Sequence, residues 1–121
     1  MTFQAKKGAP LEVCGYLAEK NGVIEEIFPI KNTDASAEHY SMAPSDQFDA
    51  IRKIRDQKLT LRAAFHSHPE SPARPSAEDI RLAYDPSISY LILSLMNPQP
   101  DLKSFIIRNS TVTPEEITVE N

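Results

Sequence analysis

The residues of this sequence most able to do chemistry are His66 and His68, followed along the chain by Asp79. Alternate residues of an extended strand point to the same face, so the two imidazoles are expected side by side. The proline-rich stretch 69–75 cannot be regular structure, and it is long enough to return Asp79 to the histidines. Two neutral ring nitrogens and one carboxylate oxygen form a ligand set that zinc accepts, with the fourth tetrahedral position left open for water. The spacing therefore predicts a catalytic zinc site.

Each of these residues also has an ordinary structural explanation. A histidine near a strand end is most often a satisfied core or surface residue. Ser76 and Asp79 could be only the N-cap of a helix and its partner. These explanations would have to coincide, however. A His-x-His strand end, a stiff loop and a Ser-x-x-Asp helix start in succession favour the metal site.

Hydrolysis at such a site also needs a base that accepts a proton from water. The candidate is Glu12, which stands where a polar stretch gives way to the mostly apolar run Val13–Ala18. Gly15, within that run, permits close approach of neighbouring backbone. An acid before a strand is usually only solvated, so these residues by themselves leave both interpretations of Glu12 open. Cys14, between them, is expected to be a small buried apolar residue.

Together these segments resemble the signature of the JAMM (MPN+) metalloprotease family. That signature has a Glu, then much later His-Ser/Thr-His-Pro, and then Ser-x-x-Asp. In this chain it reads Glu12-Val13-Cys14-Gly15, His66-Ser67-His68-Pro69 and Ser76-x-x-Asp79, with no departure at a ligand position. The resemblance covers roughly Pro10 to Asn109 and is strongest to the short bacterial and archaeal members.

The resemblance implies a role for each matching residue. His66, His68 and Asp79 would hold one zinc ion, and Glu12 would hold and deprotonate the water. Ser76 would donate its hydroxyl to the oxyanion, a contribution typically worth about 3 kcal/mol. The implied activity is zinc-dependent cleavage of a peptide or isopeptide bond at the Gly-Gly tail of a ubiquitin-like or sulfur-carrier protein. We expect such a tail to bind by strand addition along a sheet edge beside the metal.

The elements that must position these residues follow from periodicity and turn signals. Strands are expected over residues 13–18 and 23–30, joined at Asn21-Gly22 because both residues tolerate positive φ. A helix is expected near residues 45–57, with Phe48, Ile51 and Ile54 as its inner face. Ser76 is expected to open a second helix. Further strands are expected over residues 59–66, 89–96, 104–108 and 111–119, the last an edge strand because of Pro114.

Strands and helices mixed without strict alternation predict an α+β or α/β sandwich. The resemblance implies an α/β/α sandwich, a mixed sheet flanked by helices and similar in layout to cytidine deaminases. A length of 121 residues, 40% of them hydrophobic, fits one domain over residues 1–121. The family usually carries a strand and a longer helix before the glutamate. Because this chain has a short segment there, pairing with another chain, as in a homodimer, would be one way to support the sheet edge.

Charge and cysteine content limit the remaining functions. The net charge of -4 argues against a broad nucleic-acid surface. One cysteine excludes an intrachain disulfide and favours a reducing compartment. The first residues lack a signal-peptide core, and no apolar run approaches the roughly 20 residues that span a bilayer. We therefore expect a soluble, cytoplasmic protein that binds neither nucleic acid nor membrane.

Two other functions stay open. A non-catalytic MPN scaffold would bind partners only, but scaffold members commonly lose ligands and this chain keeps every one. A RadC-like, DNA-associated JAB domain resembles the same motif. That type typically has Asn between the histidines, where this chain has Ser67, and the pI of about 5.3 also disfavours DNA binding.

Overall fold

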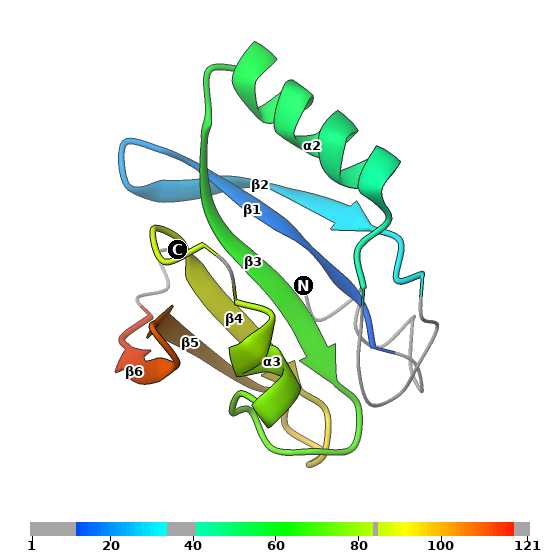
Figure 1. Ribbon diagram of the computed structural model, residues 1–121, viewed down its shortest axis with the longest axis vertical. Helices are drawn as coiled ribbons and strands as arrows, with labels where there is room; N and C mark the ends of the chain where they lie inside the picture. The colour runs from blue at the N-terminus through cyan, green and yellow to red at the C-terminus, as the bar shows by residue number, and fades with distance from the viewer. Residues whose placement is uncertain (1–11, 34–40, 84, 118–121) are drawn as a thin grey trace.

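The computed structural model describes residues 12–33, 41–83 and 85–117. Their centre is a six-stranded sheet in the order β2-β1-β3-β4-β5-β6 (Figure 1). The parallel pair is β3 with β4, and the other neighbours are antiparallel, so the sheet is mixed as predicted. The elements are β1 (Cys14–Lys20), β2 (Val23–Ile30), α2 (Pro44–Asp56), β3 (Thr60–His68), α3 (Ala77–Arg81), β4 (Ser89–Ser94), β5 (Asp101–Arg108) and β6 (Thr111–Glu115).

The first two strands form the predicted hairpin. Asn21 and Gly22 both have positive φ, 54° and 82°, between the paired residues Lys20 and Val23. Two such residues in succession match the twist of the strands that they join. The hairpin fixes the register of β1, the strand that begins two residues after Glu12.

Helix α2 lies on one face of the sheet, but it packs with a different side than predicted. Its buried residues are Ala50 and Ile54, whereas Phe48 and Ile51 are 66% and 46% exposed. Each three-residue step turns about 60° backwards around a helix, so Phe48, Ile51 and Ile54 fan over about 120°. Of these three side chains, only Ile54 faces the sheet, and the small side chain of Ala50 lets the helix approach closely. The inner face predicted from these three residues is therefore wrong at Phe48 and Ile51.

Both described helices cover the same face of the sheet. Ala50 and Ile54 of α2 pack with Ala18 of β1, and Ile80 of α3 packs against the neighbouring cluster around Ala64. Tyr16 of β1 contacts both clusters. The described residues include no helix on the opposite face, where the expected three-layer sandwich would have its second helical layer. Among those residues, no helix has the length and apolar character needed to cross a membrane.

Gly15 of β1 lies in close contact with both neighbouring strands, β2 and β3. A methyl group at this position would lie 2.4 Å from the carbonyl oxygen of Phe28 and 2.6 Å from the ring of Phe65. Neither contact is tolerable without movement of the backbone or of a buried ring. The close backbone approach expected at Gly15 is confirmed: the space beside its Cα is filled by the backbone of β2 and by the Phe65 ring of β3.

The histidine-bearing strand β3 is interior, since β1 pairs with it as far as His66 and β4 as far as His68. The outer edges belong to β2 and β6, which carry Pro29 and Pro114. Prolines in sheets are typical of edge strands, because a proline has no N–H to donate to a neighbouring strand. Both sides of β3 are thus paired with neighbouring strands, and the expected addition of a tail along a sheet edge beside the metal stays a prediction.

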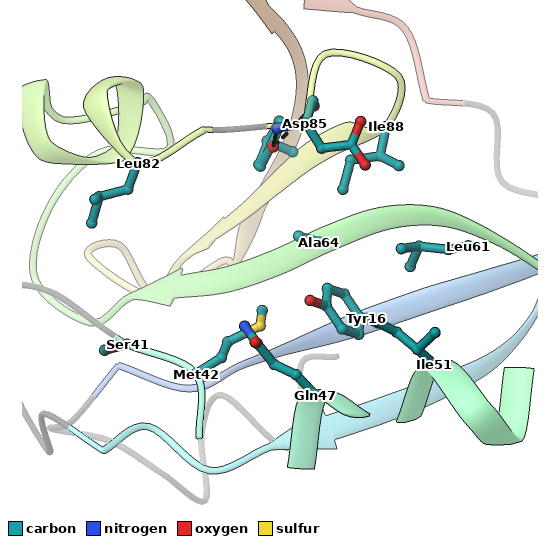
Figure 2. Close-up of a pocket in the computed structure, with 11 residues that line it drawn as sticks. Tyr16, Ser41, Met42, Gln47, Ile51, Leu61, Ala64, Leu82, Asp85 and Ile88 are labelled. Atoms are coloured by element: carbon teal, nitrogen blue, oxygen red, sulfur yellow. Dashed lines mark hydrogen bonds between the residues drawn. The ribbon is translucent and has the colours of Figure 1, made fainter. Parts of the chain in front are cut away.

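A cavity of about 460 Å³ opens on the helix-bearing face (Figure 2). Its walls come from β1, β3, α2 and the segment after α3, with Tyr16, Ala64, Ile51 and Leu82 among them. Tyr16 of β1 pairs with Ala64 of β3, and two residues along the strands Cys14 pairs with His66. Alternation therefore places the side chains of all four residues on the same face of the sheet. The cavity therefore lies along the same strands, and on the same face, as the histidines.

Candidate metal centre

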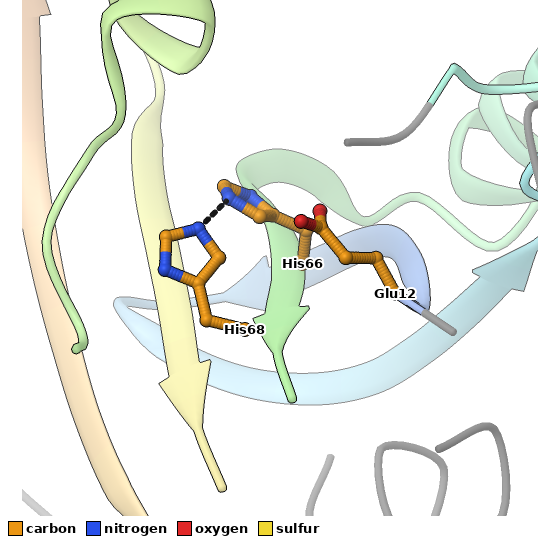
Figure 3. Close-up of side chains that lie close together, drawn as sticks. All are labelled: Glu12, His66 and His68. Carbon is orange, nitrogen blue, oxygen red and sulfur yellow. Dashed lines mark hydrogen bonds between the residues drawn. The ribbon is translucent and has the colours of Figure 1, made fainter. Parts of the chain in front are cut away.

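The two histidines occupy the end of β3 and are both buried, at 2% and 4% exposure. Their side chains lie on one face of the strand, with the Nε2 atoms 3.1 Å apart (Figure 3). The strand continues to His68 instead of ending at His66, because β4 pairs in parallel through His68 and Ser94. That pairing holds both imidazoles on a rigid element.

Asp79 completes a triangle of donor atoms. Its Oδ2 lies 3.1 Å from Nε2 of His66 and 3.1 Å from Nε2 of His68. Ligand atoms in tetrahedral positions around one zinc ion, at bond lengths of about 2.0–2.1 Å, lie about 3.3 Å from one another. The three donors therefore have both the chemistry and the mutual spacing of a zinc ligand set.

The loop after β3 determines the tautomer of His68. Its Nδ1 lies 2.8 Å from the carbonyl oxygen of Pro72, which can only accept a hydrogen bond. Nδ1 therefore carries the hydrogen, and in the neutral ring Nε2 presents a lone pair to the Asp79 carboxylate. Two acceptors at this distance need a proton or a metal ion between them. A second ring nitrogen fixed by a carbonyl is a common feature of histidine ligands.

The end of β4 holds this loop in place. The Ser94 hydroxyl donates to the carbonyl oxygen of Ser71 at 2.5 Å, and the Leu95 N–H donates to the carbonyl oxygen of His68 at 3.0 Å. These bonds position the Pro72 carbonyl that orients His68. Sequence reasoning missed Pro72 and Ser94, because only the prolines hinted at a rigid loop and nothing marked the partner strand.

The charges of the three groups are strongly coupled. Burial raises the pKa of Asp79, but the hydrogen bonds with His66 and His68 outweigh it and hold that pKa well below its usual range. Burial lowers the pKa of His66, with Asp79 opposing the shift. Burial also lowers the pKa of His68, but the hydrogen bonds with Asp79 and Pro72 outweigh it and raise that pKa above its ordinary value. Asp79 is thus an anion at neutral pH, as a metal ligand must be.

Ser76 begins helix α3 as the predicted N-cap. Its Oγ accepts from the Asp79 N–H at 3.0 Å, and Asp79 Oδ2 accepts from the Ser76 N–H at 2.9 Å, a complete capping box. The structural interpretation of the pair is therefore confirmed, and the capping oxygen is the same one that faces the histidines. Capping uses a lone pair of the Ser76 hydroxyl, so its hydrogen can still be donated to another group.

Glu12 brings a second carboxyl group to the histidines. One of its oxygens and a ring nitrogen from each histidine all lie within 4.8 Å of one another (Figure 3). The residue is 3% exposed, and Oε1 is buried without a hydrogen-bond partner among the described residues. Burial raises the pKa of Glu12 to about 8, with Asp79 adding to the shift and His68 opposing it. A buried carboxyl group with a pKa near neutrality is suited to accept and return a proton.

The raised pKa of Glu12 predicts a pH-dependent loss of stability in protein stripped of divalent ions by a chelator. The pKa rises from 4.5 to about 8 on folding, so the stability contribution is fully present below about pH 4.5 and lost as the pH rises through about 8. Relative to Glu12→Gln protein, the free energy of unfolding of the wild type should fall by a few kcal/mol between about pH 5 and pH 9. Urea unfolding of both proteins measures this difference, and a constant difference would contradict the raised pKa.

Cys14 is buried beside this group but is not suited to bind a metal. Its thiol donates to the carbonyl oxygen of Ile30 at 3.3 Å. Burial, reinforced by the neighbouring Glu12, raises the pKa of the Cys14 thiol to about 12. A thiol that stays protonated is neither a nucleophile nor a metal ligand. The expectation of a small buried residue is confirmed.

Comparison with known sequences finds relatives over almost the whole chain. The model of a family described as prokaryotic homologs of the JAB domain matches residues 1–108. The CysO-cysteine peptidase of Mycobacterium tuberculosis is 30% identical over 122 residues, which cover 98% of this chain and 84% of that protein. The desampylase of Pyrococcus furiosus is 26% identical over 111 residues, which cover 91% of this chain and 77% of that protein.

Solved structures share the fold. A solution structure of a protein from Desulfitobacterium hafniense is 45% identical and superposes with a TM-score of 0.87, covering 96% of this chain and 83% of that one. A crystal structure of a JAB1/MPN domain protein from Archaeoglobus fulgidus is 19% identical, with a TM-score of 0.61 and coverage of 95% and 85%. The predicted fold, a mixed sheet flanked by helices, is confirmed.

Proposed function

The chain belongs to the family of prokaryotic homologs of the JAB domain and is a peptidase of the JAMM type, and from this premise we propose a zinc-dependent reaction at the end of a carrier protein. The bond cleaved is a peptide or isopeptide bond at the C-terminal Gly-Gly tail of a ubiquitin-like or sulfur-carrier protein. The observation that carries the proposal is the triangle of donor atoms beside a buried carboxyl group whose pKa is about 8.

In this proposal, His66, His68 and Asp79 hold one zinc ion. When bound, the zinc ion polarises the scissile carbonyl and lowers the pKa of water toward roughly 7. The donor set favours zinc because imidazole nitrogen and carboxylate oxygen suit a metal of intermediate softness. Burial of both imidazoles keeps bulk water from competing for their nitrogens.

Glu12 is the proposed proton carrier. Its carboxylate accepts a proton from the attacking water and delivers it to the departing amine, so the residue begins and ends the cycle ionised. A pKa of about 8 places both the ionised and the protonated form within reach near neutral pH. Ser76 is the proposed oxyanion donor, because its exposed hydroxyl keeps a hydrogen available while its oxygen caps α3.

The substrate class follows from the relatives and from the cavity. One relative is named a CysO-cysteine peptidase, and the other is named a desampylase. The sheet offers no free edge at β3, so we propose that the tail crosses the face of the sheet along the cavity. The lining residues Tyr16, Ala64 and Leu82 come from the same three segments that supply Glu12, His66 and Asp79.

The experiment offers the zinc-loaded protein two substrates that share one tail. The first is a small carrier protein that ends in Gly-Gly-Cys, and the second is the same carrier joined through its Gly-Gly end to a lysine side chain. Mass spectrometry should detect release of the Gly-Gly-ended carrier from at least one of them, and a chelator should abolish it. A carrier with both glycines replaced by leucine is the control. Failure to cleave either substrate, or cleavage that the chelator leaves intact, would refute the proposal.

A further inference from the structure

Ser67, between the two histidines, points away from them and contacts the segment that carries Glu12. Its Oγ accepts from the Val13 N–H at 2.9 Å, and its own N–H donates to the Val13 carbonyl oxygen at 2.9 Å. The side chain is almost fully buried, at 1% exposure. In a strand, the side chain between two same-face residues points to the opposite face. Here the Ser67 side chain uses this orientation to bond Val13, just before β1 begins.

The serine hydroxyl takes the place of a backbone acceptor at this point. The regular pairing of β1 with β3 ends at Cys14 and His66, and Val13 is the residue just before Cys14. Ser67 N–H still makes a ladder-type bond to Val13, but the Val13 N–H is satisfied by a side chain. A residue without a hydroxyl at this position would leave a partly buried N–H without its acceptor.

Asn32 holds the same segment from the other side. Its Nδ2 donates to the Glu12 carbonyl oxygen at 3.1 Å, while its Oδ1 accepts from the Ser41 N–H at 3.0 Å. Asn32 follows β2 and forms an isolated bridge with Met42, so it is itself well fixed. The Glu12–Val13 backbone therefore carries hydrogen bonds from two separate elements just before β1 begins.

We propose that Ser67 and Asn32 are positioning residues that hold the Glu12 carboxyl group at the histidine pair. The carboxyl group is not held by its own contacts alone, because Glu12 Oε1 has no hydrogen-bond partner among the described residues. Its placement depends on the backbone from which it projects. Proton transfer requires heavy atoms within about 3 Å, so a small displacement of that backbone lowers the rate. The inference rests on the proposed role of Glu12.

The test compares Ser67→Ala with Ser67→Thr. Loss of the hydroxyl should lower kcat by about 10- to 100-fold with KM within about twofold of the wild type, because the proton carrier is displaced but the tail site is untouched. Threonine keeps the hydroxyl and should recover kcat to within about threefold of the wild type. Both variants should retain the zinc content of the wild type, since neither removes a proposed ligand. Asn32→Asp keeps the acceptor for Ser41 but loses the donor to Glu12, and should lower kcat in the same way.

Ser104→Ala is the matched control. Ser104 is also a buried serine of the same sheet, at 3% exposure, but its hydroxyl donates to Glu115. Its removal should lower the melting temperature without changing kcat. A similar fall of kcat in Ser104→Ala and Ser67→Ala would overturn the inference, as would an unchanged kcat in Ser67→Ala. Parallel loss of zinc and activity in Ser67→Ala would also overturn it, because the metal site as a whole, and not only the position of Glu12, would then depend on Ser67.

A second readout does not depend on activity. Hydrogen exchange of the Val13 amide, followed by NMR in zinc-free protein, should be at least about tenfold faster in Ser67→Ala than in the wild type or Ser67→Thr. Equal exchange rates in all three proteins would show that Ser67 does not hold the segment. If the wild type cleaves no carrier, the proposed function fails, and the exchange rates still decide whether Ser67 holds the Glu12 segment.

Discussion

Glu12→Gln protein is expected to lose about 10²- to 10⁴-fold in kcat while it keeps a full complement of zinc. Glutamine has nearly the shape of glutamate but cannot accept a proton, so the substitution removes the proton carrier and leaves the cavity intact. Glu12 is buried beside the histidines. None of its atoms belongs to the triangle of donor atoms that His66, His68 and Asp79 form. The measurement is steady-state release of the Gly-Gly-ended carrier, with zinc determined on the same sample by atomic spectroscopy.

Glu25→Gln serves as the control for this prediction. Glu25 lies exposed on β2 and its loss removes the same charge from the protein without touching the site. We expect its kcat to match that of the wild type. Wild-type turnover in Glu12→Gln protein would exclude Glu12 as the base, and loss of zinc would instead make it a ligand.

Asp79→Asn protein is expected to bind zinc at least about 10²-fold more weakly than the wild type and to lose activity at limiting zinc. Substitution of residues that only support a ligand typically weakens metal affinity by about 10- to 100-fold, so a direct carboxylate ligand should matter more. The amide oxygen of asparagine can still accept from the Ser76 N–H, which keeps the helix cap. Competition with a chromogenic zinc chelator measures the affinity, and excess zinc should restore part of the activity.

Glu78→Gln is the matched variant, because Glu78 lies in the same first turn of α3. It removes one negative charge from that turn but none of the donor atoms. Its zinc affinity should stay within about threefold of the wild type. Equal weakening in both variants would mean that net charge at the helix start, and not coordination by Asp79, controls the affinity.

The parts of the site that follow from local rules could be predicted from the sequence. Alternation along a strand places His66 and His68 on one face, whatever the rest of the fold does. The Asn21-Gly22 turn and the Ser76 cap are likewise decided by a few neighbouring residues. Short-range patterns are enough to predict each of these features, and the folded protein has all of them.

The parts that depend on distant segments could not be predicted in this way. Which side of α2 faces the sheet depends on its contacts with β1 and β2, where Ala50 packs in the cluster with Ala18 while Phe48 stays exposed. Nothing in the sequence around Ser67 or Pro72 shows that their partners would be Val13 and His68. The raised pKa of Glu12 is also a property of its surroundings, since burial is its main cause.

Asp79 Oδ2 both accepts the capping hydrogen bond of α3 and faces the two histidines. The proposed metal site and the folded start of α3 therefore depend on the same atom. In the proposed site, a metal ion bound by Asp79 would require the first turn of α3 to be formed, so ordering of this turn would reduce the net free energy of binding. Pro69, Pro72 and Pro75 reduce that loss, because they restrict the chain even when no ion is bound. In the proposed site, these prolines would preorganise the loop and so raise the affinity for the metal ion, although none of them is a proposed ligand.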